Sequence, residues 1–156
     1  MVATSTTPVQ VKDRFGLLVG VMSVTAATTH TCALLADGTA ACWGDGPGLG
    51  PDNGTHTWGL VAGIVPLPEY SLVGLSAGRF HTCAVESGGR ALCWGANAQG
   101  QLGVPVVKQA PPSLVPGLSA VAEISAGEVH SCARLMNGGV RCWGNNDLGQ
   151  LASWGD

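Results

Sequence analysis

Three histidines recur at nearly equal spacing along the chain, and each stands two positions before a cysteine. His30, His81 and His130 lie 51 and 49 positions apart. Imidazoles that converge can bind Zn²⁺, and a zinc ion with an open coordination position lowers the pKa of bound water to roughly 7, as hydrolysis requires. One histidine per unit is also what a packing and hydrogen-bonding position in a repeated structure produces. The spacing leaves both interpretations open, and we prefer the structural one.

Six cysteines form three pairs whose members lie ten positions apart: Cys32 with Cys42, Cys83 with Cys93, and Cys132 with Cys142. A glycine follows the midpoint of each pair, at Gly38, Gly89 and Gly138. A three-residue hairpin loop with that glycine in the left-handed conformation places the two cysteines of a pair opposite each other. Opposed residues come within or just below the Cα separation of disulfides, roughly 4.4 to 6.8 Å. The sequence therefore predicts an intra-hairpin disulfide in each unit.

Other uses of these cysteines are less favoured. The sequence contains neither C-x-x-C nor the paired short spacings of zinc modules, and a nucleophile is expected once, not three times. Oxidation of the pairs depends on the compartment, because the cytosol keeps thiols reduced. An extracellular or periplasmic location follows only if the pairs are oxidised.

Tryptophans share the period of the histidines and cysteines, since each second cysteine is followed by one, at Trp43, Trp94 and Trp143. We expect them to pack between neighbouring units, with stacking on a ligand as the alternative. Short runs of Val, Leu, Ala, Thr and Cys between glycine-containing turns indicate strands, and no helical period persists. A period near 50 residues is typical of propeller-type arrays.

Two pairs of motifs carry a family resemblance: "ISAGEVHSCA" with "VRCWGNNDLGQL", and "LSAGRFHTCA" with "ALCWGANAQGQLG". They resemble the RCC1 repeat (regulator of chromosome condensation). The resemblance implies an all-β fold, a β-propeller in which each repeat forms one four-stranded blade and the histidines lie towards the central axis. The paired cysteines are similar to those of bacterial and extracellular versions. The first unit departs from the pattern, because Ala27 stands where the others have Gly78 and Gly127.

The units divide the chain into a partial propeller. We expect blade 1 at 24–70, blade 2 at 71–120 and blade 3 at 121–156, the last without its own outer strand. Residues 7–11 resemble an outer strand that completes another blade. Propellers typically carry four to eight blades, so three cannot close a ring. We therefore expect a homo-oligomer with strand exchange: a dimer of three plus three blades, or alternatively a trimer of nine.

Charge and hydropathy exclude two classes of partner. Seven Lys and Arg against ten Asp and Glu, with no basic cluster, argue against nucleic acid. The apolar stretch 15–27 is too short to span a bilayer, so we expect no membrane segment. This stretch could be a signal-peptide core, but it fits a strand of the first unit, and we favour the strand. No export signal is therefore secure.

No catalytic motif stands out, and the leading interpretation is a binding scaffold. Its blade-connecting loops, within 51–71 and 104–117, would present a surface to a protein partner. One alternative is a metal-dependent hydrolase with Zn²⁺ held by His30, His81 and His130 near the channel of the assembled ring. Another is a fragment of a longer propeller with no individual function. Apart from that zinc, we expect no cofactor.

Overall fold

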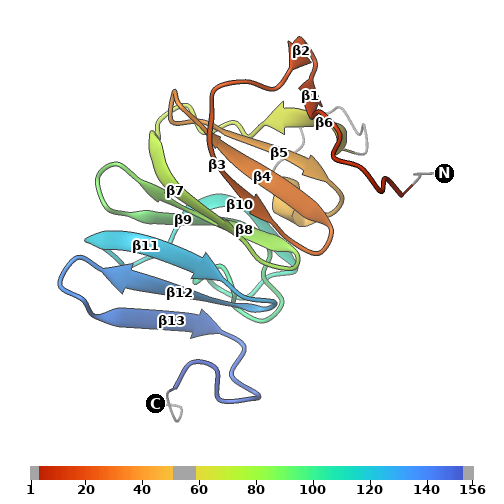
Figure 1. Ribbon diagram of the computed structural model, residues 1–156. Coiled ribbons are helices and arrows are strands. Elements are labelled where there is room, and N and C mark those ends of the chain that lie inside the picture. Colours follow the sequence, from red (N-terminus) through yellow and green to blue (C-terminus); the bar gives the residue numbers. More distant parts are fainter. Residues whose placement is uncertain (1–3, 51–58, 153–156) are drawn as a thin grey trace.

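A computed structural model of the chain describes residues 4–50 and 59–152, with the side chains of 59–61 left aside. Its described residues form three β-sheets that follow one another from the N-terminus to the C-terminus like the blades of a propeller (Figure 1). In the first blade, a 3₁₀ turn, η1 (Pro47–Leu49), follows the third strand of the meander. The all-β propeller architecture expected from the repeats is thereby confirmed. No helix in the described ranges is long and apolar enough to cross a membrane.

The first blade is an antiparallel meander with an N-terminal addition. Its strands are β3 (Val21–Ala26), β4 (His30–Leu35), β5 (Ala40–Gly44) and β6 (Gly59–Ile64). The short strand β1 (Lys12–Asp13) lies parallel to β6 and pairs with β2 (Gly16–Leu17), so the sheet order is β2-β1-β6-β5-β4-β3. The stretch at 15–27 therefore contributes strands to this sheet.

The second and third blades repeat the meander. The second contains β7 (Leu72–Ala77), β8 (His81–Glu86), β9 (Ala91–Ala96) and β10 (Gln109–Leu114). The third contains β11 (Val121–Ala126), β12 (His130–Leu135) and β13 (Val140–Gly144). Within the described residues it is three-stranded, and no strand lies beside β13.

Hairpin turns set the register inside each blade. Gly38, Gly89 and Gly138 have φ of 79°, 78° and 86°, the left-handed region that a side chain would strain. Each turn aligns the two cysteines of its blade, and all three predicted disulfides are present, with Cα–Cα distances of 4.1, 4.1 and 4.0 Å in chain order. The hairpin argument from the sequence is confirmed.

The hydrophobic core lies between blades. One apolar layer joins the first two blades, with Leu34 on one side and Leu92 and Trp94 on the other. A second layer joins the next two blades, with Val85 facing Ile124. A blade therefore buries each of its faces only if it has a neighbour on both sides.

A smaller cluster covers part of the outward face of the first blade. Leu18 and Val11, from the segment before β3, pack on Ala33 and Ala41. The outer strand expected at 7–11 ends at Val11 and has no strand partner among the described residues. Its pairing with another copy remains a prediction.

Candidate functional site

The repeat histidines of the first two blades point into the junctions between blades. His30 and His81 are buried, with 2% and 0% of their surfaces exposed. His30 Nε2 lies 2.8 Å from Thr82 Oγ1, and His81 Nε2 lies 2.9 Å from Ser131 Oγ. Each imidazole is therefore bonded to a hydroxyl of the next blade.

The hydroxyl in each junction also donates a hydrogen bond to a main-chain carbonyl. Thr82 Oγ1 donates to Gly48 O at 2.8 Å, and Ser131 Oγ donates to Gln101 O at 2.9 Å. A hydroxyl has one proton, so its oxygen can only accept from the imidazole. The histidines are thereby assigned as Nε2–H tautomers. We call this arrangement of imidazole, hydroxyl and carbonyl the interblade relay.

Two of the repeat tryptophans donate hydrogen bonds to the same carbonyls. Trp94 Nε1 donates to Gly48 O at 2.9 Å, and Trp143 Nε1 donates to Gln101 O at 2.9 Å. In the first two blades, the loop that follows Cys-Trp-Gly is thus held by two donors of the next blade. Trp94 is fully buried in the first junction, so an interblade role accounts for its indole without a ligand.

Burial keeps the relay histidines neutral. Burial lowers the pKa of His30, and burial together with the neighbouring His30 and His130 lowers that of His81 to about 4. Within the described chain, neither His30 Nδ1 nor His81 Nδ1 has a hydrogen-bond partner. A second proton on either ring would therefore create a buried charge without a counterion, which is costly.

The zinc site considered for the three histidines receives no support from this arrangement. The Nε2 atoms of His30 and His81 are engaged by hydroxyls, and the six cysteines are all in disulfides. Among the described residues, no group of three or more His, Cys, Asp or Glu side chains is placed to hold a metal ion. Within one chain, the histidines therefore serve separate junctions and do not form a common centre.

The surface offers a second candidate site. One end of the blades carries the β5–β6 and β9–β10 connections together with the turns at 27–29, 78–80 and 127–129. We call this end the long-loop face. The β9–β10 loop is tied at its base by Asn97, whose Nδ2 donates to Pro105 O at 2.9 Å and whose Oδ1 accepts from Leu102 N at 3.0 Å. The predicted loop at 51–71 lies partly outside the described residues, at 51–58.

Above this anchored base, the β9–β10 loop presents apolar side chains to solvent. Val106 and Val107 are 68% and 47% exposed, and Lys108 beside them is exposed. A hollow of about 260 Å³ lies nearby between η1 and β10, lined by residues that include Pro47 and Pro111. The loop therefore combines a fixed backbone with exposed contact groups.

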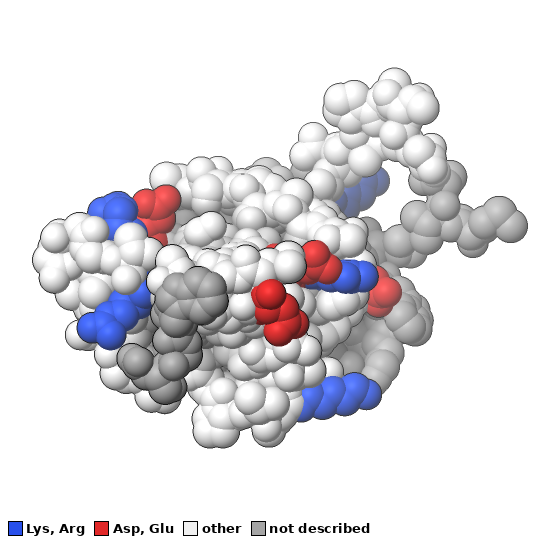
Figure 2. Space-filling view, turned by 90° about the horizontal axis from the view of Figure 1, so that it is seen from below, with Lys and Arg blue, Asp and Glu red and all other residues white. Residues whose placement is uncertain are grey.

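Charge on the surface is sparse and mixed. Figure 2 shows a few blue and red side chains, some of them side by side, on a mostly uncharged face. At the turns of the second and third blades, Arg79 and Glu128 form an ion pair beside a hollow of about 640 Å³. This hollow is lined by the ends of β3, β7 and β11 and by the turns that follow them. The face drawn in Figure 2 thus carries no patch of one charge sign.

Sequence comparison identifies the repeats directly. Two models described as the regulator of chromosome condensation (RCC1) repeat match the chain, one at 73–101 and 121–150 and the other at 88–134. The chain belongs to the RCC1-repeat family. A search of curated proteins found no match.

Solved RCC1 propellers match the fold. Prp20p from Saccharomyces cerevisiae, described with its binding to Gsp1p and histones, is 28% identical with a TM-score of 0.76, over 87% of this chain and 33% of that one. Yeast RCC1 (Prp20) bound to Kap60 is 27% identical with a TM-score of 0.73, over 87% and 32%. Human WBSCR16, at 24% identity and a TM-score of 0.73 over 84% and 36%, shows the fold alone. The chain spans about a third of the length of these proteins.

The unusual first RCC1 unit has a steric explanation. A Cβ at Gly78 would lie 2.3 Å from His81 Cε1, so glycine is needed beneath that ring. The first unit has Ala27 at the position of Gly78. Its glycine next to the histidine ring is Gly48 instead, where a Cβ would lie 2.3 Å from His30 Cε1. At the position of Gly48, the second blade carries a side chain. The methyl group of Ala27 is thus compensated by a missing side chain in the loop.

Substituting Gly48 by Ala should destabilise the first junction. The added methyl group would overlap the buried imidazole of His30, and overpacking of this kind costs about 1–3 kcal/mol. Urea unfolding followed by tryptophan fluorescence measures the change. Gly63→Ala is the matched control, because its Cβ would meet nothing closer than Cys42 O at 3.9 Å. Equal stability of the two variants would contradict the steric role of Gly48.

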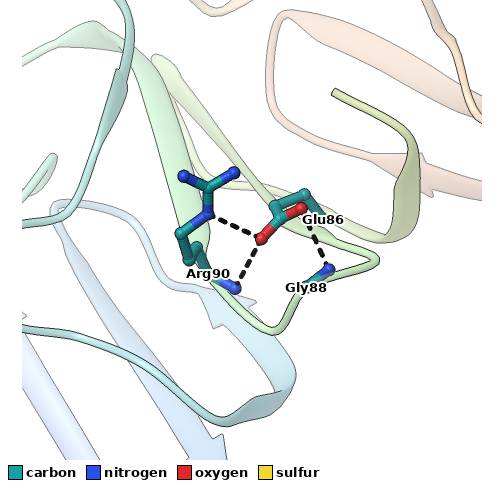
Figure 3. Close-up of polar contacts among 3 residues, drawn as sticks. All are labelled: Glu86, Gly88 and Arg90. Atoms are coloured by element: carbon teal, nitrogen blue, oxygen red, sulfur yellow. Dashed lines mark hydrogen bonds and ion pairs between the residues drawn. The ribbon is translucent and has the colours of Figure 1, made fainter. Parts of the chain in front are cut away.

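Glu86, which the sequence does not single out, stabilises a hairpin turn. Glu86 is buried and accepts hydrogen bonds from Arg90 Nε at 2.8 Å, Gly88 N at 2.9 Å and Arg90 N at 3.1 Å (Figure 3). The bond from the Arg90 side chain, followed by that from Gly88 N, lowers the pKa of Glu86 to about 2. Its contribution to stability is therefore present above pH 4.5 and lost as the pH falls towards 2. Glu86 closes the β8–β9 turn and gives no sign of catalysis.

Proposed function

We propose that this RCC1-repeat chain is a binding scaffold that docks a protein partner on its long-loop face. The observation that carries the proposal is the β9–β10 loop, whose backbone is tied by Asn97 while Val106 and Val107 remain exposed. A rigid loop loses little conformational entropy on binding, so its exposed apolar groups can contribute fully to affinity. Such groups on a fixed loop are typical of recognition surfaces.

The chemistry of the loop indicates the kind of partner surface. Two valines call for an apolar depression, and the exposed Lys108 beside them favours a carboxylate at its edge. The hollow beside η1 and β10 can receive a side chain of the partner. Protein binding by the RCC1 propeller Prp20p, described for Gsp1p and histones, supports the same class of function. The hydrolase alternative has no comparable observation among the described residues.

The experiment compares loop variants of the whole chain. The immobilised chain captures proteins from a lysate of cells that express it, and each captured protein is purified and titrated by calorimetry. The double variant Val106→Asp/Val107→Asp should bind the partner at least tenfold more weakly. Met136→Asp is the control, because Met136 is equally exposed, at 68%, on a hairpin at the opposite end of the blades. Partners that bind the loop variant as tightly as the wild type would overturn the proposal.

A further inference from the structure

We propose that two copies of this chain associate head to tail into a six-bladed ring. In this ring the third blade of one copy packs on the first blade of the other, and residues 7–11 add to β13 of the neighbouring copy. This inference is independent of the partner-binding proposal. It rests on three features of the described residues: an interblade relay left half-complete at both ends, an apolar face covered only in part, and a segment aligned to pair with β13.

The interblade relay is incomplete at both ends in complementary ways. On the first blade, Thr31 and Trp43 hold the positions of Thr82 and Trp94, but no described residue accepts from their side chains. On the third blade, His130 holds the position of His81, and no described hydroxyl receives its ring. One end therefore has the hydroxyl and the indole, and the other has the imidazole.

The carbonyl that would complete the relay is already in place on the third blade. In the second blade, Gln101 Oε1 accepts from Gln99 N at 2.9 Å, in the turn that presents Gln101 O to the third blade. The third blade repeats this turn, with Gln150 Oε1 accepting from Leu148 N at 2.9 Å. The carbonyl of Gln150 is thus preorganised for Thr31 and Trp43 of another copy.

Part of the outward face of the first blade lacks the cover that the other blades have among the described residues. Val24 is 60% exposed, whereas Ile124, at the same position of the third blade, is only 7% exposed because the second blade covers it. Likewise Val21 is 38% exposed, against 3% for Leu72. An exposed apolar face of a blade that elsewhere packs on another blade is suited to the same kind of neighbour.

The segment before the first blade is aligned to pair with β13, beside which the described part of the third blade has no further strand. Leu18 N donates to Val11 O at 3.1 Å, as Leu118 N donates to Val115 O at 3.4 Å, so Val11 corresponds to Val115. Residues 7–11 then match 111–115, which include the end of β10. Since β10 pairs with β9, residues 7–11 are placed to pair with β13, the equivalent strand of the third blade.

A second copy fits these ends because one chain carries both halves of the interface. Two different surfaces that bind each other form a closed ring when the rotation permits it. Two copies give six blades, within the four to eight of known propellers. Closure would also cover the edge of β13, which has no strand beside it among the described residues.

The molar mass of the oxidised chain in solution tests the association. Light scattering over a range of micromolar concentrations should give twice the chain mass of 15.7 kDa. Val24→Asp should reduce this to a single chain, because a carboxylate would be buried in the interface. Val73→Asp is the matched control, since Val73 is 59% exposed on β7, in the second blade, which already has a blade on each side. A wild-type mass of one chain would overturn the association, and so would equal masses for the two variants. A wild-type mass of three chains would overturn the two-copy ring.

Crosslinking tests the strand exchange separately. The pairing of Leu114 with Leu92 places Gln10 opposite Arg141 of the other copy. Chains carrying Gln10→Cys and chains carrying Arg141→Cys, mixed and oxidised mildly, should form a covalent pair on a non-reducing gel. Gln10→Cys mixed with Val73→Cys should not. A two-chain mass without the first crosslink would overturn the role of residues 7–11.

Discussion

Replacing His81 by Ala is expected to lower the free energy of unfolding by about 3 kcal/mol at pH 7. The imidazole is fully buried between the second and third blades, so its removal leaves a cavity in the junction. It also removes the donor that lies 2.9 Å from Ser131 Oγ. Urea unfolding followed by tryptophan fluorescence gives the free energy of unfolding directly.

A double-mutant cycle separates the hydrogen bond from the cavity. Single His81→Ala and Ser131→Ala variants and their combination should yield a coupling energy of about 1 kcal/mol, typical of one buried hydrogen bond. Ser131→Ala alone should also lose the bond to Gln101 O. A His81→Ala variant within 0.5 kcal/mol of the wild type would show that the junction does not depend on this ring.

Removing the disulfide of the second blade should lower the free energy of unfolding about as much as His81→Ala does. Its cysteines are ten positions apart, and a loop of this length stabilises the folded chain by about 3 kcal/mol through the entropy of the unfolded state. We expect the double variant Cys83→Ala/Cys93→Ala to lower the free energy of unfolding by about that amount. Thermal and urea unfolding under non-reducing conditions measure it.

The pair Cys132 and Cys142 provides the comparison, because it closes a loop of the same length at a less buried position. If loop entropy dominates, both double variants should lose nearly the same free energy of unfolding. If packing alone mattered, the variant in the second blade should lose more. A thiol titration of the unfolded wild type should find no free cysteine. Free thiols in the purified protein, or a variant as stable as the wild type, would contradict the structural role of the disulfide.

Features set by local periodicity were predictable from the sequence. A strand has a side-chain period of two, and a turn of known length fixes which residues face each other. The positions of Gly38 and Cys32 were therefore sufficient to place Cys42 opposite, and the same count holds in all three blades. Repetition of one pattern also determined the number of blades.

Features that join different blades were harder to predict. His81 and Thr82 are neighbours on one strand, so they point to opposite faces. One contacts the following blade and the other the preceding blade, at Ser131 and His30. That alternation was readable, but the partner of each side chain depends on how the blades stack. Glu86 offered no repeat signal at all, because its bonds lie within a single turn.

The relay also implies a pH dependence of stability. The pKa of His81 is about 4 in the folded chain and 6.5 in its unperturbed form, so below pH 6.5 the unfolded chain binds the additional proton. Stability should therefore be complete above pH 6.5 and fall as the pH drops towards 4, by up to about 3 kcal/mol at 1.36 kcal/mol per pKa unit. The fall should be clearly smaller in His81→Ala, where His30 still contributes through its own lowered pKa, as urea unfolding at pH 4.5 and pH 7 will show.

A neutral histidine wedged between adjacent blades is the feature on which this interpretation of the molecule depends, and ¹⁵N NMR of the His81 ring tests it most directly. We expect an Nε2–H tautomer at pH 7, a pKa near 4, and no change in the ring signals on adding one equivalent of Zn²⁺. A pKa at or above 6.5, an Nδ1–H tautomer, or a Zn²⁺-dependent shift of the ring nitrogens would contradict it.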